Sequence, residues 1–139
     1  MARNHDALED IRRLTFEYAR AVDGQDLEGV VALFTEDALW DARGFGMPEM
    51  KGRDDIRAFY TSIFENVAHC AHLTLNHLVE VDGDTATGHV YIHALAVARD
   101  GTRSESIGYY DDTYVRTDSG WRFSSRAAQP LLPPPPPAV

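Results

Sequence analysis

Apolar residues in the first part of the chain recur at spacings of three and four, which is typical of amphipathic helices. The stripe across residues 8–22 predicts a long first helix, which Gly24 then ends. Asp26 can cap a short second helix, because its carboxylate can accept from a backbone N–H of the first turn. This helix carries Leu27, Val30, Val31 and Phe34 toward the core. A short strand is expected next, at residues 38–42.

A third helix is expected after a loop at residues 44–52. The acidic residues Asp54 and Asp55 suit its first turn, where they meet the positive end of the helix dipole. Its apolar stripe continues until the helix ends near His69. Three helices therefore precede the main sheet.

From Ala71 onward the apolar period changes to two, which is typical of strands with one buried face. The alternation is broken by three dipeptides that signal hairpins, Asp82-Gly83, Asp100-Gly101 and Ser119-Gly120. The second half is thus an antiparallel meander of four long strands. Helices gathered before a curved antiparallel sheet predict an α+β domain, with the helices covering one face and leaving a pocket between. One domain is expected over residues 1–129, followed by a proline-rich, disordered tail at 130–139 that stays outside the sheet.

The first hairpin allows a prediction of register. If Asp82-Gly83 is a two-residue turn, Val81 pairs with Asp84 and His72 lies opposite His93. The side chains that then share one face of the sheet are His72, Thr74, Asn76, His89, Tyr91 and His93, with Tyr110 and Asp112 beside them on the next strand. His77 falls on the other, apolar face. A solvated face is an alternative interpretation, but such a face normally collects lysine and glutamate, so the composition favours a semi-enclosed polar pocket.

Asp23 is in the last turn of the first predicted helix, where its carboxylate meets the negative end of the helix dipole. This position works against stability. A residue that local physics disfavours is a candidate for chemistry, and His72 at the start of the first long strand is the partner to expect.

Composition limits the possible ligands. A formal net charge of −9 at pH 7 argues against nucleic acid and acidic membrane surfaces as partners, so the expected partner is a neutral or lipophilic small molecule.

The single cysteine, Cys70, excludes an intramolecular disulfide and is expected to be a packing residue rather than a nucleophile. Without a membrane-length apolar run or a signal-peptide pattern, the chain is expected to be cytoplasmic. The apolar positions on the outer sheet face suggest a homodimer.

Five loose motifs occur in an order that makes them more specific together, at residues 11–23, 33–40, 52–56, 72–86 and 120–123. Across residues 5–129 the chain resembles the SnoaL-like branch of the nuclear transport factor 2-like superfamily. This branch includes scytalone dehydratase, bile acid dehydratase and hexachlorocyclohexane dehydrochlorinase. The resemblance implies a cone of curved sheet packed by three helices around a deep pocket, often dimeric through the outer face of the sheet.

The resemblance also implies site residues. Asp23 and His72 match the aspartate and histidine that form a dyad in the dehydratase-like members. Tyr18 matches a tyrosine of bile acid dehydratase that assists the leaving group, and His93 is similar in place to the second histidine of scytalone dehydratase. Arg126 is the nearest candidate for a C-terminal arginine of those enzymes.

The chemistry expected of such a set is acid and base catalysis without a cofactor. A neutral His72 held by ionised Asp23 could remove a proton beside a carbonyl or leaving group. Tyr18, His93 or Tyr110 could then protonate a departing hydroxyl or polarise a carbonyl. The predicted activity is that of a dehydratase, isomerase or cyclase on a lipophilic cyclic substrate, polyketide-like or steroid-like. The expected substrate-binding residues are Trp40, Phe45, Met47, Phe59, Asn76, Tyr91, Tyr110 and Arg126.

Two alternatives stay open. The same fold also serves as a non-catalytic ligand-binding or assembly protein, since a fold alone does not decide function. A metal site of His72, His93 and Asp23 is the other, although no short ligand spacing in the sequence supports it.

Overall fold

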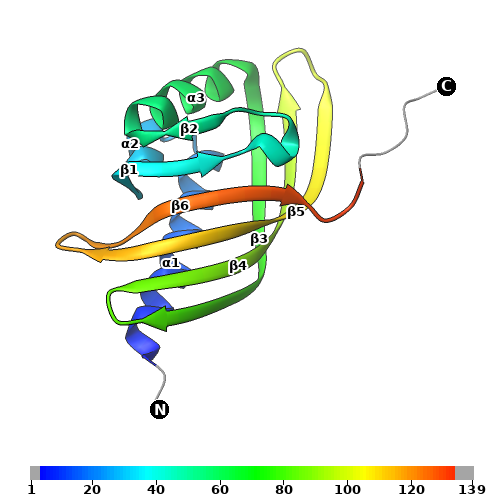
Figure 1. Cartoon of the computed structure of the whole chain (residues 1–139). Coiled ribbons are helices and arrows are strands. Elements are labelled where there is room, and N and C mark those ends of the chain that lie inside the picture. Colours follow the sequence, from blue (N-terminus) through cyan, green and yellow to red (C-terminus); the bar gives the residue numbers. More distant parts are fainter. Residues whose placement is uncertain (1–3, 134–139) are drawn as a thin grey trace.

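The computed structural model of the chain describes residues 4–133, which form three α-helices and one six-stranded sheet (Figure 1). The helices are α1 (His5–Asp23), α2 (Leu27–Val31) and α3 (Gly52–Asn66), with a short 3-10 helix, η1, at Arg43–Phe45. The strands are β1 (Phe34–Asp41), β2 (Glu49–Lys51), β3 (Val67–Asp82), β4 (Thr85–Ala98), β5 (Arg103–Thr117) and β6 (Gly120–Pro130). The predicted α+β architecture is confirmed.

The strand order across the sheet is β2-β1-β6-β5-β4-β3, and every neighbouring pair is antiparallel except β1 and β6, which are parallel. The helix α1 lies across one face of the curved sheet, and α3 packs beside β1 and β2 (Figure 1). The four long strands and the short strand predicted at residues 38–42 are present, the latter as β1, which begins earlier, and β2 is one strand more than predicted. A three-residue strand such as β2 is too short for a period of two to appear, so the sequence indicated only a loop there.

The helix predictions agree closely with the structure. Asn4 caps α1 by accepting a hydrogen bond from the backbone N–H of Ala7 at 3.1 Å, and Gly24 follows its last residue. Asp26 caps α2 as predicted, accepting from the N–H of Gly29 at 3.0 Å. The third helix ends earlier than expected, because Val67 already has an extended backbone and begins β3.

The predicted register of the first hairpin is wrong. The turn is made by Gly83 and Asp84, so that Asp82 pairs with Thr85 and Val81 pairs with Ala86. Gly83 has a φ of 61°, a left-handed conformation that glycine adopts without strain. The turn is therefore displaced toward the C-terminus from the expected position.

A β-bulge between Leu75 and Leu78 changes the register of β3 a second time. Asn76 lies in this bulge with a φ of 50°, in the left-handed region. Beyond it His72 is opposite Ala94, and His93 is opposite Leu73. Because side chains alternate between faces, His72 and His93 project from opposite sides of the sheet.

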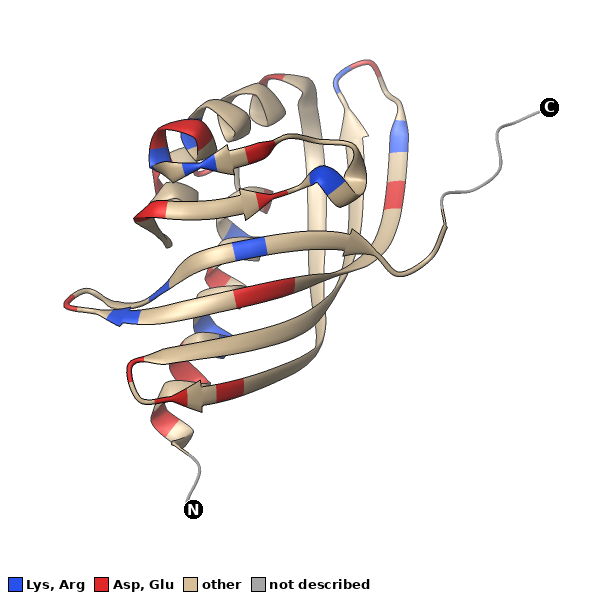
Figure 2. Cartoon of the chain, viewed as in Figure 1, with Lys and Arg blue, Asp and Glu red and all other residues tan. Residues whose placement is uncertain are grey.

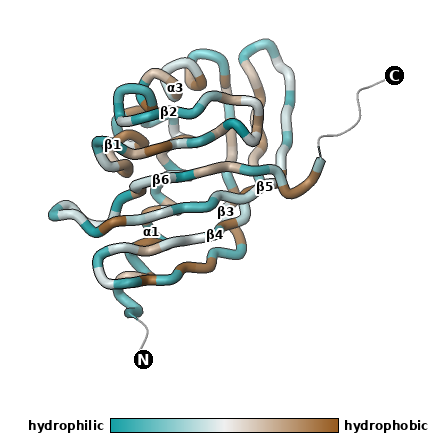
Figure 3. The backbone as a smooth tube through the Cα atoms, in the orientation of Figure 1, coloured by the Kyte–Doolittle hydropathy of each residue, from teal (hydrophilic) through white to brown (hydrophobic). Residues whose placement is uncertain are grey.

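The second hairpin is also shifted by one residue, so that His89 is opposite Asp111 and Tyr91 is opposite Tyr109. The outer face consequently carries part of the polar set that was expected to line a pocket, namely His89, Tyr91 and His93, whereas His72, Tyr110 and Asp112 lie on the inner face. Exposed leucines lie among them, and the largest exposed fraction is the 73% of Leu78. Hydrophobic and hydrophilic stretches alternate along the strands (Figure 3), while acidic and basic residues are spread over many elements (Figure 2).

The C-terminal strand runs further than predicted. Pro130 is its last residue, and the next N–H, that of Leu131, donates to the carbonyl of Ile107 at 2.9 Å. Residues 134–139 of the predicted tail lie outside the described part of the chain. None of the helices within residues 4–133 is both long and apolar enough to cross a membrane.

Candidate active site

A cavity of about 270 Å³ lies between the inner face of the sheet, α1 and α3. Its walls are largely apolar and include the four aromatic and methionine residues that the sequence predicted, Trp40, Phe45, Met47 and Phe59. Alanines of β4 and β6 complete the walls on the sheet side. The few polar groups that line it come from tyrosine, serine, cysteine and histidine side chains. An apolar cavity with a few convergent polar groups is the usual form of a small-molecule site.

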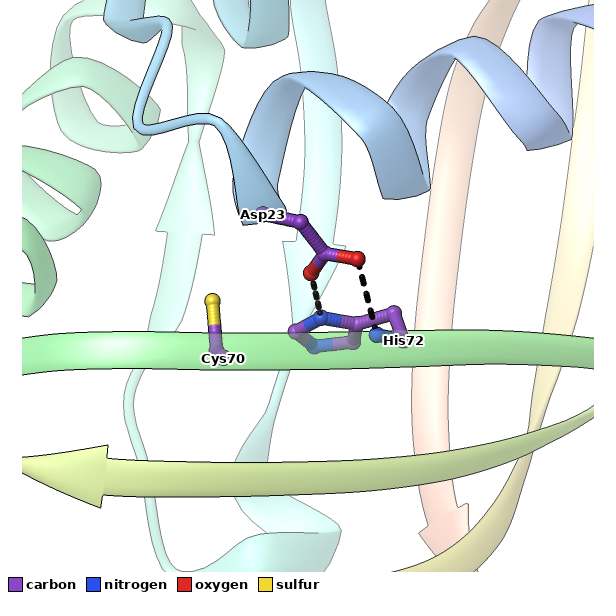
Figure 4. A group of neighbouring side chains, drawn as sticks. All are labelled: Asp23, Cys70 and His72. Carbon is purple, nitrogen blue, oxygen red and sulfur yellow. Dashed lines mark hydrogen bonds and ion pairs between the residues drawn. The ribbon is translucent and has the colours of Figure 1, made fainter.

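His72 lines this cavity, and Asp23 contacts His72 from the end of α1 (Figure 4). The Nδ1 atom of His72 lies 2.7 Å from Oδ1 of Asp23, and the backbone N–H of His72 donates to Oδ2 at 2.9 Å. The Asp23 carboxylate is the last side chain of α1, and α1 packs along β3, so the end of the helix meets the strand at this point. The two side chains are partly exposed, with exposed fractions of 29% for Asp23 and 18% for His72.

This geometry determines the tautomer of His72 when Asp23 is ionised. A carboxylate can only accept hydrogen bonds, so Nδ1 carries the proton and Nε2 has a free lone pair. Within residues 4–133 no protein group makes a hydrogen bond to Nε2. His72 therefore presents a base at the wall of the cavity.

Cys70 lies beside the pair on the same strand, and its thiol contacts the carbonyl of Val22 at 3.7 Å. Burial, with the neighbouring Asp23 carboxylate adding to its effect, raises the pKa of the Cys70 thiol to about 11. The thiol is thus protonated at neutral pH, as expected for a cysteine that is not a nucleophile. A donor atom from each of Asp23, Cys70 and His72 lies within 4.8 Å of the other two, which makes these residues the candidate metal ligands in the described part of the chain.

The hydroxyl groups of Tyr18 and Tyr60 contact one another deep in the cavity wall. The indole N–H of Trp40 donates to the hydroxyl of Tyr60 at 2.8 Å. Because indole is a donor only, these contacts use one of the two phenolic protons and leave the other to donate elsewhere. Burial raises the pKa of both tyrosines, so both stay protonated at neutral pH. The pair therefore has one O–H left to donate a hydrogen bond, whichever tyrosine donates to the other.

Arg126 lies behind these tyrosines rather than on the cavity surface. Its guanidinium donates to both carboxylate oxygens of Asp112, at 2.8 and 2.9 Å, and both side chains are fully buried. Its Cζ lies 4.4 Å from the ring centroid of Tyr18 and 3.9 Å from that of Tyr110. Burial acts to lower the pKa of Arg126, but the Asp112 carboxylate outweighs it and raises that pKa. Arg126 therefore supports the cavity wall and does not reach a ligand directly.

A buried polar chain continues from this ion pair away from the cavity. The hydroxyl of Tyr114 donates to Asp112 at 2.8 Å and lies 3.1 Å from Nε2 of His77. His77 was expected on the face opposite His72, but it points to the inner face, where its Nε2 has a partner and its Nδ1 has none among the described residues. Burial is the main cause that lowers the pKa of His77, to about 4.

Besides Arg126, three predicted site residues lie away from the cavity. His93 faces the outer side of the sheet, where its Nε2 is 2.7 Å from a carboxylate oxygen of Glu105. Tyr91 is on the same outer face, and Asn76 is exposed in the bulge. The metal set of Asp23, His72 and His93 cannot form, because the two histidines project from opposite faces. The structure does bring together Tyr18, Asp23, His72, Trp40, Phe45, Met47, Phe59 and Tyr110.

Sequence reasoning missed Tyr60, and it placed Asp112 on the polar face without recognising its ion pair with Arg126. Tyr60 belongs to the apolar stripe of α3, where a tyrosine looks like an ordinary core residue. The signal that could have found it is the need of a buried tyrosine hydroxyl for a partner. The pairing of Asp112 with Arg126 carried no such signal, because the period of a strand places a residue on a face without indicating its partner.

The chain matches the family model of the SnoaL-like domain over residues 3–127, and it therefore belongs to the SnoaL-like family. An uncharacterized protein of Mycobacterium tuberculosis is 34% identical to it over 120 residues, which cover 84% of this chain and 80% of that protein. The relation thus extends over most of both proteins.

Solved structures share the nuclear transport factor 2-like, cystatin-like fold. A protein of Novosphingobium aromaticivorans, provisionally named an aromatic ring hydroxylase, is 35% identical, with a TM-score of 0.91 over 96% of this chain and 94% of that chain. A second protein of that organism, provisionally named a scytalone dehydratase, is 23% identical, with a TM-score of 0.86 over 93% of this chain and 87% of its own. The second likeness is one of fold.

Proposed function

We propose that the chain is an acid–base enzyme of the lyase or isomerase type, acting on a small lipophilic cyclic molecule without a cofactor. The observation that carries the proposal is the hydrogen bond from His72 Nδ1 to Asp23, made by a ring that lines an apolar cavity. Such a pair supplies a base of fixed tautomer and a carboxylate to stabilise the imidazolium that forms.

The reaction proposed begins with removal of a proton from a carbon beside a carbonyl group by His72 Nε2. The electron pair of that C–H bond moves toward the carbonyl oxygen, which the Tyr18 and Tyr60 hydroxyl pair stabilises by donating a hydrogen bond. In a dehydration, the departing hydroxyl leaves with a proton from the imidazolium or from Tyr18. In an isomerisation, the imidazolium returns its proton to another carbon of the same molecule.

The volume and the lining of the cavity favour a small and neutral substrate. Its volume of about 270 Å³ is at the lower end of the range for ligand pockets, roughly 300–1,000 Å³. No lysine or arginine of the described chain lines it, and Arg126 behind the wall is already paired with Asp112. A carboxylate or phosphate on the substrate would lack a counter-charge there. The provisional name of the N. aromaticivorans relative, an aromatic ring hydroxylase, agrees with a ring-sized ligand.

The experiment is a deuterium-exchange screen of cyclic ketones and hydroxyketones. The full chain is incubated with each compound in deuterium oxide, and mass spectrometry follows both deuterium uptake at carbon and loss of water. We expect uptake with the wild type and a decrease of about 100-fold or more in His72→Gln. The matched control is His93→Gln, because His93 is also bonded to a carboxylate but faces away from the cavity.

The second candidate function, a non-catalytic small-molecule carrier, rests on the same cavity. In that case ring compounds would bind, as followed by quenching of tryptophan fluorescence that a Trp121→Phe background assigns to Trp40, but none would exchange deuterium or lose water. Equal exchange rates in the wild type and in His72→Gln would also refute catalysis by the dyad.

A further inference from the structure

We propose that Asp23, Cys70 and His72 form a binding site for a zinc ion at the wall of the cavity. A carboxylate oxygen, the thiol sulfur and a ring nitrogen all lie within 4.8 Å of one another. Figure 4 shows the three side chains gathered where the end of α1 meets β3. This proposal concerns binding of the ion and does not depend on the proposed enzymatic function.

The fold holds the three donors on two rigid elements. Cys70 and His72 are two residues apart on β3, so their side chains project from the same face of the sheet. The carboxylate of Asp23 is fixed opposite them by the backbone N–H of His72 at 2.9 Å. A ligand set from a strand and a helix end loses little conformational freedom when an ion binds.

The chemistry of the donors favours zinc. Zinc binds cysteine sulfur at about 2.3 Å and histidine nitrogen or carboxylate oxygen at about 2.0–2.2 Å, so tetrahedral donors are about 3.3–3.8 Å apart. The 2.7 Å between His72 Nδ1 and Asp23 Oδ1 would need to open by less than about 1 Å. The ion would displace the Nδ1 proton. A sulfur ligand and an imidazole disfavour magnesium and calcium, which prefer oxygen.

The zinc ion would keep one coordination position that no protein ligand fills. Three protein ligands leave a fourth position, and Cys70 and His72 both line the cavity, so that position faces the space where a ligand would lie. The same atoms would then be unable to act as a dyad, since zinc would occupy Nδ1 of His72. This last consequence, unlike binding itself, rests on the proposed function, and it predicts that zinc inhibits turnover.

Cobalt spectroscopy tests the binding directly. The full chain, freed of metal with a chelator and then desalted, is titrated with Co²⁺ and afterwards with Zn²⁺. We expect one ion per chain, the intense visible absorption of tetrahedral cobalt, and a thiolate-to-cobalt charge-transfer band that zinc abolishes. Because the chain has one cysteine, that band can only arise from Cys70. The weak spectrum of octahedral cobalt without a charge-transfer band would overturn the proposal.

Variants locate the site. Isothermal titration should show zinc affinity lowered roughly tenfold or more in Cys70→Ser and in Asp23→Asn. His93→Gln is the control, since His93 and Glu105 form a histidine–carboxylate pair on the outer face. Loss of affinity in His93→Gln but not in Cys70→Ser would refute the assignment. If Cys70→Ser does not fold, protection of the wild-type thiol from a thiol reagent by zinc gives the same answer, and no protection contradicts the proposal.

Discussion

Asp23 holds His72 through both of its carboxylate oxygens, one bonded to the ring Nδ1 and the other to the backbone N–H. The backbone bond fixes the carboxylate on the strand, and the ring bond fixes the imidazole on the carboxylate. A histidine held in this way can accept a proton at Nε2 without first changing its orientation. The cost is a carboxylate at the negative end of α1.

Replacing Asp23 with asparagine should separate activity from stability. Relief of the unfavourable interaction with the helix dipole, about 0.3–1 kcal/mol, offsets the loss of a charged hydrogen-bond acceptor. We therefore expect the free energy of unfolding in urea to change by less than about 1 kcal/mol. The turnover found in the exchange screen should fall by roughly 10²–10⁴, because the side-chain amide favours the wrong tautomer of His72. Glu105→Gln, which removes the corresponding carboxylate from His93, should leave turnover within about twofold.

Tyr60→Phe should lower stability, because it leaves the buried indole N–H of Trp40 without its acceptor. The expected loss is about 1–3 kcal/mol in the free energy of unfolding, measured by urea denaturation. Tyr109→Phe removes a hydroxyl from the half-exposed outer face and should change stability by less than about 0.5 kcal/mol. Equal effects of the two substitutions would show that the Trp40 contact does not stabilise the fold.

The ion pair of Asp112 and Arg126 should show strong energetic coupling. Both side chains are fully buried, so Arg126→Met leaves an unpaired carboxylate and should cost about 3–5 kcal/mol. Asp112→Leu should cost a similar amount, since it leaves an unpaired guanidinium. The double variant should be more stable than the sum of the two losses implies, and a double-mutant cycle in urea measures the difference. Strict additivity would contradict the pairing.

His77 should make stability depend on acidity. Its folded pKa of about 4 is below the reference value of 6.5, so between these pH values the unfolded chain binds more protons than the folded chain. The contribution of neutral His77 to the free energy of unfolding is fully present above pH 6.5 and is lost as the pH falls toward 4. Because the His77 side chain is partly exposed, this pH-dependent change in the free energy of unfolding should be on the order of 1 kcal/mol.

The measurement is the difference in unfolding free energy between the wild type and His77→Gln across that pH range. The groups that face His77 are the Tyr114 hydroxyl, Asp112, Arg126 and Arg12, and they are unchanged in the variant. The wild type should lose more stability than the variant on acidification. Parallel curves would mean that His77 is protonated equally in both states.

The sequence was sufficient for features that depend on local chemistry. The caps at Asp26 and Gly24 were predictable because a helix end needs particular side chains or backbone freedom. The pairing of Asp23 with His72 was predictable because a carboxylate at a helix C-terminus is unfavourable unless a partner stabilises it.

The positions of His93 and Tyr91 were not predictable, because the bulge at Asn76 adds one residue without disturbing the apolar alternation on either side. Tyr60 and Asp112 depend on tertiary packing, which periodicity does not report.

The bulge also explains how one strand serves two interior regions. In a regular strand, residues that are an odd number of positions apart face opposite sides, so His72 and His77 should have been divided between cavity and solvent. The extra residue lets both point inward, one toward Asp23 and the other toward Tyr114. Deleting Asn76 would place the two histidines four positions apart, so a regular strand would still carry both on its inner face. A strand that kept all its residues but lost the bulge would instead turn one of the two histidines toward solvent. The geometry of the candidate site therefore depends on a bulge at a position that does not line the cavity.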